Sequence, residues 1–268
     1  MTTFNPQEYW EKRLEKSFDL HGVGDIGLGI NYNNCLYKIR KFAFHQLMKS
    51  LKINFSEVKV MDIGSGTGFY IERWKELKVK AIHGTDITNV VVTKLSKQFS
   101  DVTFSQLDIG EKMENPIPTY DFISAFDVLF HIVEDARFEQ AINNIHGLLN
   151  KGGYFVISDN FVHGETKRIE HQVVRSYDYL TKTIEAAGFK HIKTIPMFVL
   201  MNDPVDTKNR FIKKIFWMIT KNVRKGETMG KLIGSVMMPI EKLLISLKSE
   251  SPATEIKLYQ KIDAECTF

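Results

Sequence analysis

Short β-rich runs alternate with longer amphipathic segments between residues 57 and 200, and this alternation limits the possible folds more than any other feature of the chain. Strands that alternate regularly with helices form a parallel sheet with helices on both faces. The almost wholly apolar run at residues 122–126 fits a strand that is buried on both faces. We therefore predict an α/β fold with a doubly wound sheet. The predicted strands are residues 58–63, 80–86, 102–107, 121–126, 154–158, 189–200 and 254–262, and the predicted helices are residues 70–77, 89–99, 135–149 and 177–187.

Two helical segments stand outside this alternation, one at the start of the chain and one inserted between the sixth and seventh strands. The insertion is predicted to hold helices at residues 207–223 and 229–247, with Pro239 kinking the second. Gly152 and Gly153 are predicted to end the helix that precedes them. The four resulting parts are a helical N-terminal segment (1–50), the core (51–200), the helical insertion (201–253) and the final strand (254–268).

Composition narrows the class of protein. The 268 residues are 43% hydrophobic and 25% charged with a net charge of +4, which is typical of a globular chain. Cys35 and Cys266 lie near opposite ends, a pattern that suits a reducing cytosol, and no metal-ligand spacing is present. The first residues lack the basic and apolar regions of a signal peptide, and residues 232–240 are too short an uncharged run to span a bilayer. We therefore expect a cytoplasmic protein without a bound metal.

The segment Asp62-Ile63-Gly64-Ser65-Gly66-Thr67-Gly68 directly follows the first predicted strand. Glycines at this point let the backbone turn tightly and approach a ligand closely. In a doubly wound sheet, ligands bind at this carboxyl end of the strands. Phe69 occupies the position where a dinucleotide-binding loop needs a small residue, and the lysine of a P-loop is missing. With Asp62 beside it, the loop favours a cationic nucleoside ligand over a pyrophosphate.

Two further acids end the next two predicted strands. Asp86 lies 22 residues after Gly64, where an acid can accept hydrogen bonds from ribose hydroxyls. Asp108 ends the third strand and can accept a hydrogen bond from the exocyclic amine of an adenine. The alternative is that each acid only caps the helix that follows it, and Asp62 could be mainly structural.

At these residues the chain resembles the class I S-adenosylmethionine-dependent methyltransferases of the small-molecule type, whose fold is a Rossmann-like seven-stranded sheet. The loop at residues 62–68 is similar to their first motif, residues 122–134 to their fourth-strand motif and residues 148–158 to the motif after it. The resemblance covers about residues 58–200 and implies S-adenosyl-L-methionine as cofactor and S-adenosyl-L-homocysteine as product. The cofactor-binding residues that it implies are Asp62, Gly64, Ser65, Gly66, Gly68, Asp86, Ile87, Asp108, Ile109, Phe126, Tyr9 and Trp10.

Methyl transfer from a sulfonium needs alignment of the reactants and exclusion of water rather than a metal or a covalent nucleophile. A hydroxyl acceptor would also need a base. His131 follows the fourth strand and is the candidate, because imidazole titrates near neutrality. The alternative is that His131 only packs against the cofactor.

Acceptor-binding residues are expected after the fifth strand and near the N-terminal helices. In the family that the chain resembles, the N-terminal segment with its Tyr-Trp-Arg start (Tyr9, Trp10 and Arg13 here) closes over the cofactor as a lid. Simple core packing is an equally good interpretation of Tyr9 and Trp10. Ser176 and Asp178 fit a helix start as well as a binding segment. The candidate substrate-binding residues are Tyr32, Arg40, Asn160, His163, Arg175 and Tyr177.

The insertion carries the excess positive charge of the chain. Residues 205–250 contain ten basic and four acidic residues, a net charge of +6. Two apolar stripes run through the predicted helices, one from Phe211 to Ile219 and one from Leu232 to Leu244. We expect a cap in which the stripes cover the acceptor pocket. The alternative is peripheral contact with an anionic membrane through residues 205–250, and the basic face could also attract a phosphorylated acceptor such as a nucleotide-sugar.

Together these features predict an enzyme that methylates an oxygen or nitrogen atom of a small molecule, such as a sugar, a nucleotide-sugar or a natural-product intermediate. One rival is an RNA or protein methyltransferase, although nucleic acid is not expected because Phe126-Asp127-Val128-Leu129 replaces the Asn/Asp-Pro-Pro-aromatic tetrapeptide of base-amine methylators. The other rival is a catalytically silent binding module that keeps the fold. The oligomeric state stays open.

Overall fold

The structure is a computed structural model that describes residues 4–113, 118–169 and 171–262. Cys266 and the last part of the predicted final segment (263–268) lie outside the described residues. Cys35 is a buried, free thiol.

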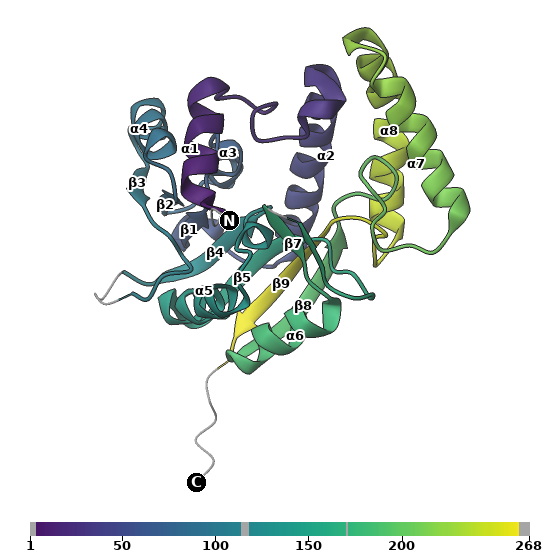
Figure 1. Cartoon of the computed structure of the whole chain (residues 1–268). Coiled ribbons are helices and arrows are strands. Elements are labelled where there is room, and N and C mark those ends of the chain that lie inside the picture. The colour runs from purple at the N-terminus through teal and green to yellow at the C-terminus, as the bar shows by residue number, and fades with distance from the viewer. Residues whose placement is uncertain (1–3, 114–117, 170, 263–268) are drawn as a thin grey trace. The chain divides into compact units, whose positions relative to one another are not determined.

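A seven-stranded sheet with the order β3-β2-β1-β4-β5-β9-β8 forms the centre of the fold (Figure 1). Strands β3, β2, β1, β4 and β5 pair in parallel. Strand β9 runs antiparallel to β8, because the amide of Met197 donates to Thr254 and the amide of Ile262 donates to Gly188. The predicted Rossmann-like seven-stranded fold is confirmed. The strands are β1 (Lys59–Ile63), β2 (Ala81–Asp86), β3 (Thr103–Gln106), β4 (Tyr120–Phe126), β5 (Leu149–Asp159), β8 (Phe189–Pro196) and β9 (Glu255–Lys261).

The helices between these strands follow the predicted periodicity closely. One continuous apolar core forms where α5 and α6 pack on β4 and β5, with Phe138, Ile142 and Ile184 fully buried against Ile123 and Phe155. Figure 1 shows α5 and α6 together on this face of the sheet. The helices of this part are α3 (Phe69–Glu76), α4 (Asn89–Gln98), α5 (Asp135–Leu148) and α6 (Tyr177–Ala186).

Two local predictions were wrong, and one hairpin was not predicted. Helix α5 ends at Leu148, before the predicted glycine stop, and Gly152 (φ 68°) instead lies inside β5. Strand β8 ends at Pro196 rather than at residue 200, since proline lacks the N–H that a ladder needs. The sequence analysis also missed an antiparallel hairpin of β6 (Lys167–Ile169) and β7 (Gln172–Val174).

The chain divides into two compact units. The first contains Met1–Glu11, Asn54–Lys193 and Lys257–Phe268, and the second contains Lys12–Ile53 and Thr194–Ile256. The second unit is mainly helical, and its helix α8 packs along α2. No described helix is long and apolar enough to cross a membrane. The remaining helices are α1 (Pro6–Lys16), α2 (Gly29–Ser50), α7 (Arg210–Val223) and α8 (Glu227–Leu247).

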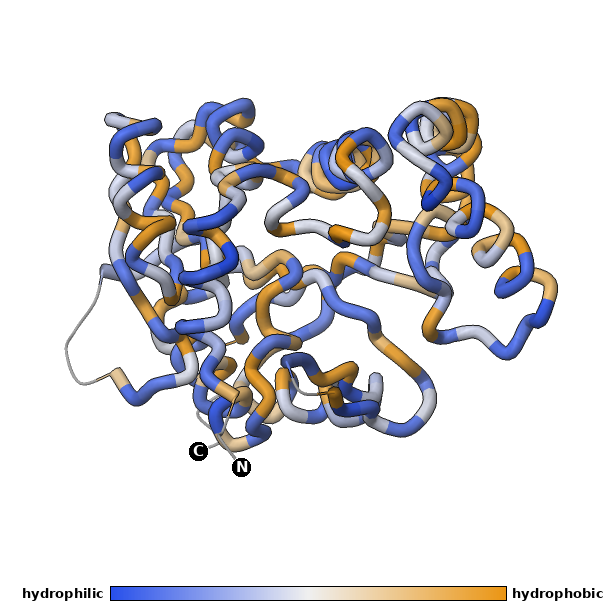
Figure 2. Tube along the Cα trace, turned by 45° about the horizontal axis from the view of Figure 1, so that its top comes forward, coloured by the Kyte–Doolittle hydropathy of each residue, from blue (hydrophilic) through white to orange (hydrophobic). Residues whose placement is uncertain are grey.

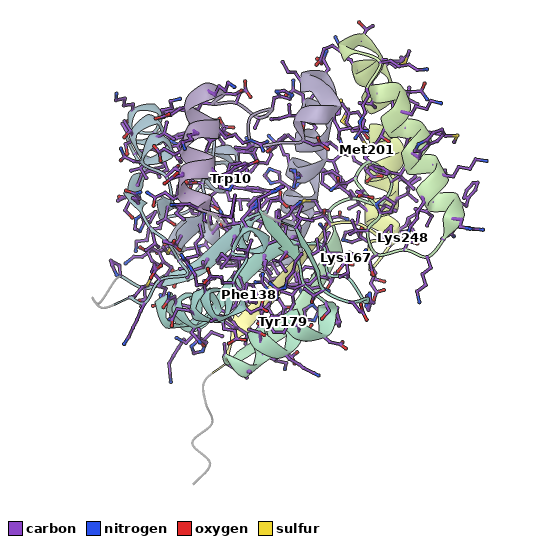
Figure 3. The ribbon with its side chains drawn as sticks, in the orientation of Figure 1. Trp10, Phe138, Lys167, Tyr179, Met201 and Lys248 are labelled. Atoms are coloured by element: carbon purple, nitrogen blue, oxygen red, sulfur yellow. The ribbon has the colours of Figure 1, made fainter. Side chains whose placement is uncertain are left out.

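One buried carboxylate organises the second unit. Glu241 of α8 is fully buried and accepts hydrogen bonds from the backbone amides of Val199 (2.6 Å), Leu200 (3.0 Å) and Met201 (3.2 Å). It thereby satisfies three donors of a segment that follows β8 and has no strand partner for them. Met201, labelled in Figure 3, also accepts a hydrogen bond from the Tyr32 hydroxyl at its carbonyl (3.0 Å).

Candidate functional site

The glycine loop joins β1 to α3 and has the geometry that only glycine adopts easily. Gly64, Gly66 and Gly68 all have positive φ angles (69°, 53° and 81°). A Cβ atom on Gly64 would lie 2.3 Å from Val128 Cγ2, so no larger residue fits there. The loop is held in place by a hydrogen bond from the Ser65 amide to the Thr85 carbonyl (2.9 Å).

Asp86 connects the end of β2 to this loop. Its Oδ2 accepts a hydrogen bond from the Gly66 amide (3.1 Å), and its Oδ1 accepts from the amide (3.0 Å) and the hydroxyl (2.8 Å) of Thr88. The side chain is buried, which raises the pKa of Asp86, while the hydrogen bonds from Thr88 and Gly66 counteract that rise. Asp86 thus holds the loop against the strand end and keeps one acceptor position of Oδ2 open.

The helix-capping alternative does not hold for Asp86. The first amides of α4, at Asn89 and Val90, donate instead to the carboxylate of Glu11 (2.9 and 2.8 Å). Glu11 lies in α1 and is distant in sequence, so α1 rather than the β2 acid satisfies this helix start.

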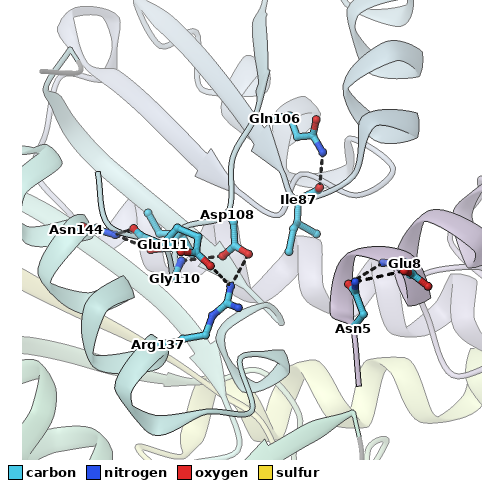
Figure 4. Close-up of polar contacts among 10 residues, drawn as sticks. Asn5, Glu8, Ile87, Gln106, Asp108, Gly110, Glu111, Arg137 and Asn144 are labelled. Carbon is cyan, nitrogen blue, oxygen red and sulfur yellow. Dashed lines mark hydrogen bonds and ion pairs between the residues drawn. The ribbon is translucent and has the colours of Figure 1, made fainter. Parts of the chain in front are cut away.

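Asp108 lies in the turn after β3 and pairs with a cation (Figure 4). Its Oδ2 is 2.6 Å from Arg137 of α5, and its Oδ1 accepts a hydrogen bond from the Gly110 amide (3.0 Å). Asn144 stabilises this turn, because its side-chain amide donates a hydrogen bond to the Ile109 carbonyl (2.8 Å). The Ile87 carbonyl in the neighbouring turn accepts from Gln106 (2.9 Å). No helix follows Asp108 directly, so a capping role does not explain it either.

The Asp62 side chain lies between β4 and the glycine loop, with Ser124 and Ser65 as its side-chain partners. Ser124, its register partner on β4, donates to Asp62 Oδ1 (2.5 Å) and accepts from Trp74 Nε1 (3.1 Å). All three side chains are buried. Burial raises the pKa of Asp62 to about 7. This placement favours the interpretation that Asp62 is mainly structural.

The raised pKa of Asp62 predicts a pH-dependent stability. The folded state keeps this proton up to about pH 7, whereas the unfolded carboxyl loses it near its model value of 3.8, so the wild type loses stability as the pH rises between these values. The full effect is on the order of 4 kcal/mol. Asp62→Asn mimics the protonated acid, and its stability relative to the wild type should rise over this pH range.

Thermal unfolding at a series of pH values checks this expectation. Asp178→Asn, at an exposed carboxyl, serves as the control and should leave the pH profile unchanged. A constant difference between Asp62→Asn and the wild type from pH 4 to 8 would show that the buried carboxyl does not titrate as described.

An aromatic cluster lies beyond the end of β4. Trp10 of α1 meets the His131 ring edge-on at 5.0 Å, and Tyr9 stacks on His171 at 5.8 Å (Trp10 is labelled in Figure 3). The Nδ1 atom of His131 lies 3.0 Å from the His171 carbonyl oxygen. Because a carbonyl can only accept, Nδ1 carries the hydrogen and the lone pair of neutral His131 is on Nε2. The structure thus brings together Tyr9, Trp10 and His131, three predicted site residues.

The end of β4 itself is tightly constrained. Phe126 is buried and stacks on Tyr70 at 3.8 Å. Asp127 has a positive φ of 59°, unusual for a residue other than glycine, and its amide donates to the hydroxyl of Ser158 (2.8 Å). The Ser158 hydroxyl in turn donates to Asp127 Oδ1 (3.0 Å), so the Asp127 side chain contacts the end of β5.

The end of β5 carries a second buried carboxyl. Asp159 accepts a hydrogen bond from the amide of Asn160 (2.6 Å). Burial raises the pKa of Asp159 to about 7, and the positive charge of Arg175 partly counteracts this. Asn160 therefore follows a group that can exchange a proton near neutral pH.

The other predicted acceptor residues have different surroundings. His163 is exposed and stacks on Tyr177 at 5.0 Å. Arg175 is buried, donates to Asp135 Oδ1 (3.0 Å) and to the Ile132 carbonyl (2.7 Å), and lies over the Phe138 ring. It holds the segment after His131 in place and is not open to a ligand.

The helix-start interpretation is confirmed for Ser176, which accepts a hydrogen bond from the Tyr179 amide at the start of α6. Ser176 therefore caps this helix. One surface hollow lies between α5 and α6, and none of the predicted site residues lines it.

Tyr32 and Arg40 belong to the second unit. Tyr32 is fully buried, and burial raises the pKa of its hydroxyl. Arg40 donates to the Met197 sulfur (3.0 Å) and lies over the rings of Tyr37 and Phe198. The structure therefore gives both side chains packing contacts inside that unit.

Several partners of the site were missed by the sequence analysis. Glu11, Arg137 and His171 contact predicted site residues, or the helix start beside them, but lie far from them in sequence. Nothing in the local sequence around these residues indicates the distant partners that they contact. Among the residues that the structure describes, no group of three or more potential ligands could hold a metal ion.

Known proteins share this architecture. The structure matches a putative sarcosine dimethylglycine methyltransferase from Galdieria sulphuraria (TM-score 0.57, 14% identity, 94% of this chain and 99% of that chain). It also matches the 1,6-didemethyltoxoflavin-N1-methyltransferase of Burkholderia thailandensis, solved with bound 1,6-didemethyltoxoflavin and S-adenosylhomocysteine (TM-score 0.55, 15% identity, 98% of this chain and 93% of that chain). A third match is the [4+2]-cyclase SpnF (0.51, 15%, 82% and 80%).

At these low identities, the structural matches establish the fold alone. No curated protein matches the sequence. A family model described as a methyltransferase domain matches residues 60–153, which include the glycine loop, Asp86, Asp108 and His131. Residues 60–153 therefore match a methyltransferase domain, in agreement with the resemblance of the sequence to the class I S-adenosylmethionine-dependent methyltransferases.

Proposed function

We propose that the protein transfers a methyl group from S-adenosyl-L-methionine to an oxygen or nitrogen atom of a small molecule. The observation that carries this proposal is the arrangement of Asp86 and Asp108 at the ends of adjacent parallel strands, beside a loop that only glycines can form. Two carboxylates at these points match a ligand with ribose hydroxyls and an exocyclic amine.

The residues present fit this cofactor. The glycine loop leaves no room for side chains at Gly64, so the backbone itself would face the ligand. The Thr67 hydroxyl in the same loop is buried and has no hydrogen-bond partner among the described residues. A polar atom of the bound cofactor would supply such a partner. Asp86 would hold the ribose, and Asp108 with the Ile109 amide would hold the adenine.

When bound, the cofactor supplies a methyl group made electrophilic by the sulfonium charge. The chain's own residues then have to orient the reactants and exclude water. Tyr9 and Trp10 provide apolar cover beside His131. His131 donates through Nδ1 to the His171 carbonyl, and its Nε2 atom is the group that would take the proton that a hydroxyl or ammonium acceptor releases.

Replacing His131 separates the base role from the packing role. His131→Phe keeps an aromatic ring against Trp10 but removes the proton acceptor, and we expect kcat to fall by about 100-fold or more while the affinity for the cofactor changes little. Steady-state kinetics across pH 6 to 9 measure this effect. Full activity of His131→Phe combined with loss of activity in His131→Ala would show that the ring only packs.

The small-molecule class of acceptor is supported by the fold neighbours. The Burkholderia thailandensis enzyme contains a bound small-molecule substrate and covers nearly the whole of this chain. The [4+2]-cyclase has a similar fold, so the fold alone does not determine which reaction is catalysed.

Incubation of the protein with methyl-labelled S-adenosylmethionine and a cell extract tests the proposal. We expect the label in the small-molecule fraction, and mass spectrometry of that fraction identifies the methylated atom. Label in the protein or RNA fraction would support the macromolecular alternative, and absence of label from all fractions would support a catalytically silent binding module. Asp86→Ala serves as the background control.

A further inference from the structure

Helices α7 and α8 expose an extended apolar surface. Six large apolar side chains of α8 repeat at helical spacing and are exposed to solvent. Leu243 and Leu247, for example, are 59% and 73% exposed. On α7, Phe211 and Trp217 are 69% and 56% exposed. Figure 2 shows the abundance of apolar residues along both helices. The exposed apolar residues, here called the hairpin face, are Phe211, Trp217, Met218, Met229, Leu232, Val236, Ile240, Leu243 and Leu247.

The hairpin face of α8 lies opposite the side with which that helix packs into its unit. Gly230, Gly234, Glu241 and Ile245 are buried and recur at helical spacing on the other side. A Cβ on Gly234 would meet the Cys35 sulfur at 2.6 Å, which shows how closely this side approaches α2. The exposed stripe from residue 229 to residue 247 is about 27 Å long at 1.5 Å per residue. The sequence predicts stripes that cover a pocket, whereas Leu232, Val236, Ile240 and Leu243 of the second stripe are exposed.

The charges on α7 and on its connection to α8 have one sign. Residues 208–225 contain seven basic residues and no acid. The two acids of α8 are both engaged within the unit, Glu241 by the amides described above and Glu227 by the amides of Ile30 (2.8 Å) and Asn31 (2.7 Å). The basic residues of the two helices and their connection are Arg210, Lys213, Lys214, Lys221, Arg224, Lys225, Lys231 and Lys242.

We propose that the hairpin face binds the surface of an anionic lipid bilayer, with α7 and α8 lying in the interface. Large exposed apolar patches on a soluble protein mark interaction sites, and an apolar stripe with basic residues beside it suits anionic headgroups over an acyl layer. The Lys221 ammonium lies 4.7 Å from the centre of the Trp217 ring. An aromatic ring beside a cationic group favours the boundary between the lipid headgroups and the acyl chains. A second copy of this chain would bring two positively charged hairpins together, which like-charge repulsion opposes.

Vesicle co-sedimentation of the full chain tests this proposal. We expect binding to vesicles of equal phosphatidylcholine and phosphatidylglycerol, little binding to phosphatidylcholine alone, and weaker binding as salt is raised. Val236→Ser/Leu243→Ser and Lys213→Glu/Lys214→Glu/Lys221→Glu should each lower the partition coefficient by about tenfold or more. All five side chains are exposed, so both variants should fold normally. Circular dichroism checks their folding.

Matched controls change the same groups elsewhere. Ile30→Ser/Ile192→Ser replaces two exposed apolar residues outside the hairpin, and Lys97→Glu/Lys182→Glu/Lys190→Glu changes the net charge equally. Both controls should bind the anionic vesicles like the wild type. No binding of the wild type to anionic vesicles, or equal losses in hairpin and control variants, would overturn the proposal. A third result would also overturn it. If the wild type is a dimer in sedimentation velocity, does not bind vesicles and becomes monomeric in Val236→Ser/Leu243→Ser, the hairpin face joins two copies of the chain.

Discussion

Asp86→Ala should raise the dissociation constant for S-adenosylhomocysteine by about 100-fold. A hydrogen bond from a ligand to a carboxylate contributes about 1.5–3 kcal/mol, and each 1.4 kcal/mol changes the affinity tenfold. The substitution also removes the acceptor that holds the Gly66 amide, so the glycine loop would lose its connection to the end of β2. Isothermal titration calorimetry with the purified chain measures the effect.

Two further variants make the Asp86 result interpretable. Asp101→Ala removes an exposed carboxylate that pairs with Lys75 outside the site, and its affinity should match the wild type. Asp86→Asn keeps an acceptor oxygen for the Gly66 amide while removing the negative charge, so it should bind with intermediate affinity. Wild-type affinity in Asp86→Ala, with the fold intact by circular dichroism, would contradict the role assigned to this acid.

Glu241→Ala should destabilise the protein by about 3–5 kcal/mol. Its carboxylate accepts from the amides of Val199, Leu200 and Met201 in a fully buried position, and alanine would leave these donors without partners. Removal of one partner from a buried charged network has a cost of this size. Urea unfolding followed by circular dichroism gives the change in the free energy of unfolding.

Two further variants serve as controls for the stability of Glu241→Ala. Glu241→Gln retains an acceptor oxygen and should lose less stability than Glu241→Ala. Glu250→Ala, at an exposed position of the same segment, should change the free energy of unfolding by less than about 0.5 kcal/mol. Equal stability of Glu241→Ala and the wild type would mean that other groups satisfy the three amides.

The fold was predictable where local sequence patterns determine structure. The apolar run of β4 and the glycine loop after β1 each carry their own signal, and the structure places both as predicted. Gly152 was misleading because glycine with positive φ ends helices and also permits an irregular turn within a strand. The β6–β7 hairpin was missed since its three-residue strands are too short to show a period of two.

The candidate site was predictable in its acids but not in their partners. Strand ends place Asp86 and Asp108, because carboxyl ends of parallel strands share one edge of the sheet. Their surroundings depend on segments that fold back from elsewhere, such as Arg137 beside Asp108 and Glu11 at the start of α4. A single sequence does not reveal such pairings.

Helix α8 shows a different limit. Its periodicity predicts a helix correctly, but apolar residues occupy more than one side, so the pattern does not indicate which side is buried. The small residues Gly230 and Gly234 mark the packed side, because close approach to α2 excludes larger residues there. The larger apolar residues of α8 are mostly exposed.

The central claim is that the glycine loop, Asp86 and Asp108 form the binding site for the methyl donor. A crystal structure of the protein with S-adenosylhomocysteine tests this most directly. We expect density for a ribose hydroxyl within hydrogen-bond distance of Asp86 Oδ2 and for the adenine beside Asp108 and the Ile109 amide. Density for the ligand elsewhere in the molecule, with the glycine loop and both carboxylates free of it, would contradict this assignment of the binding site.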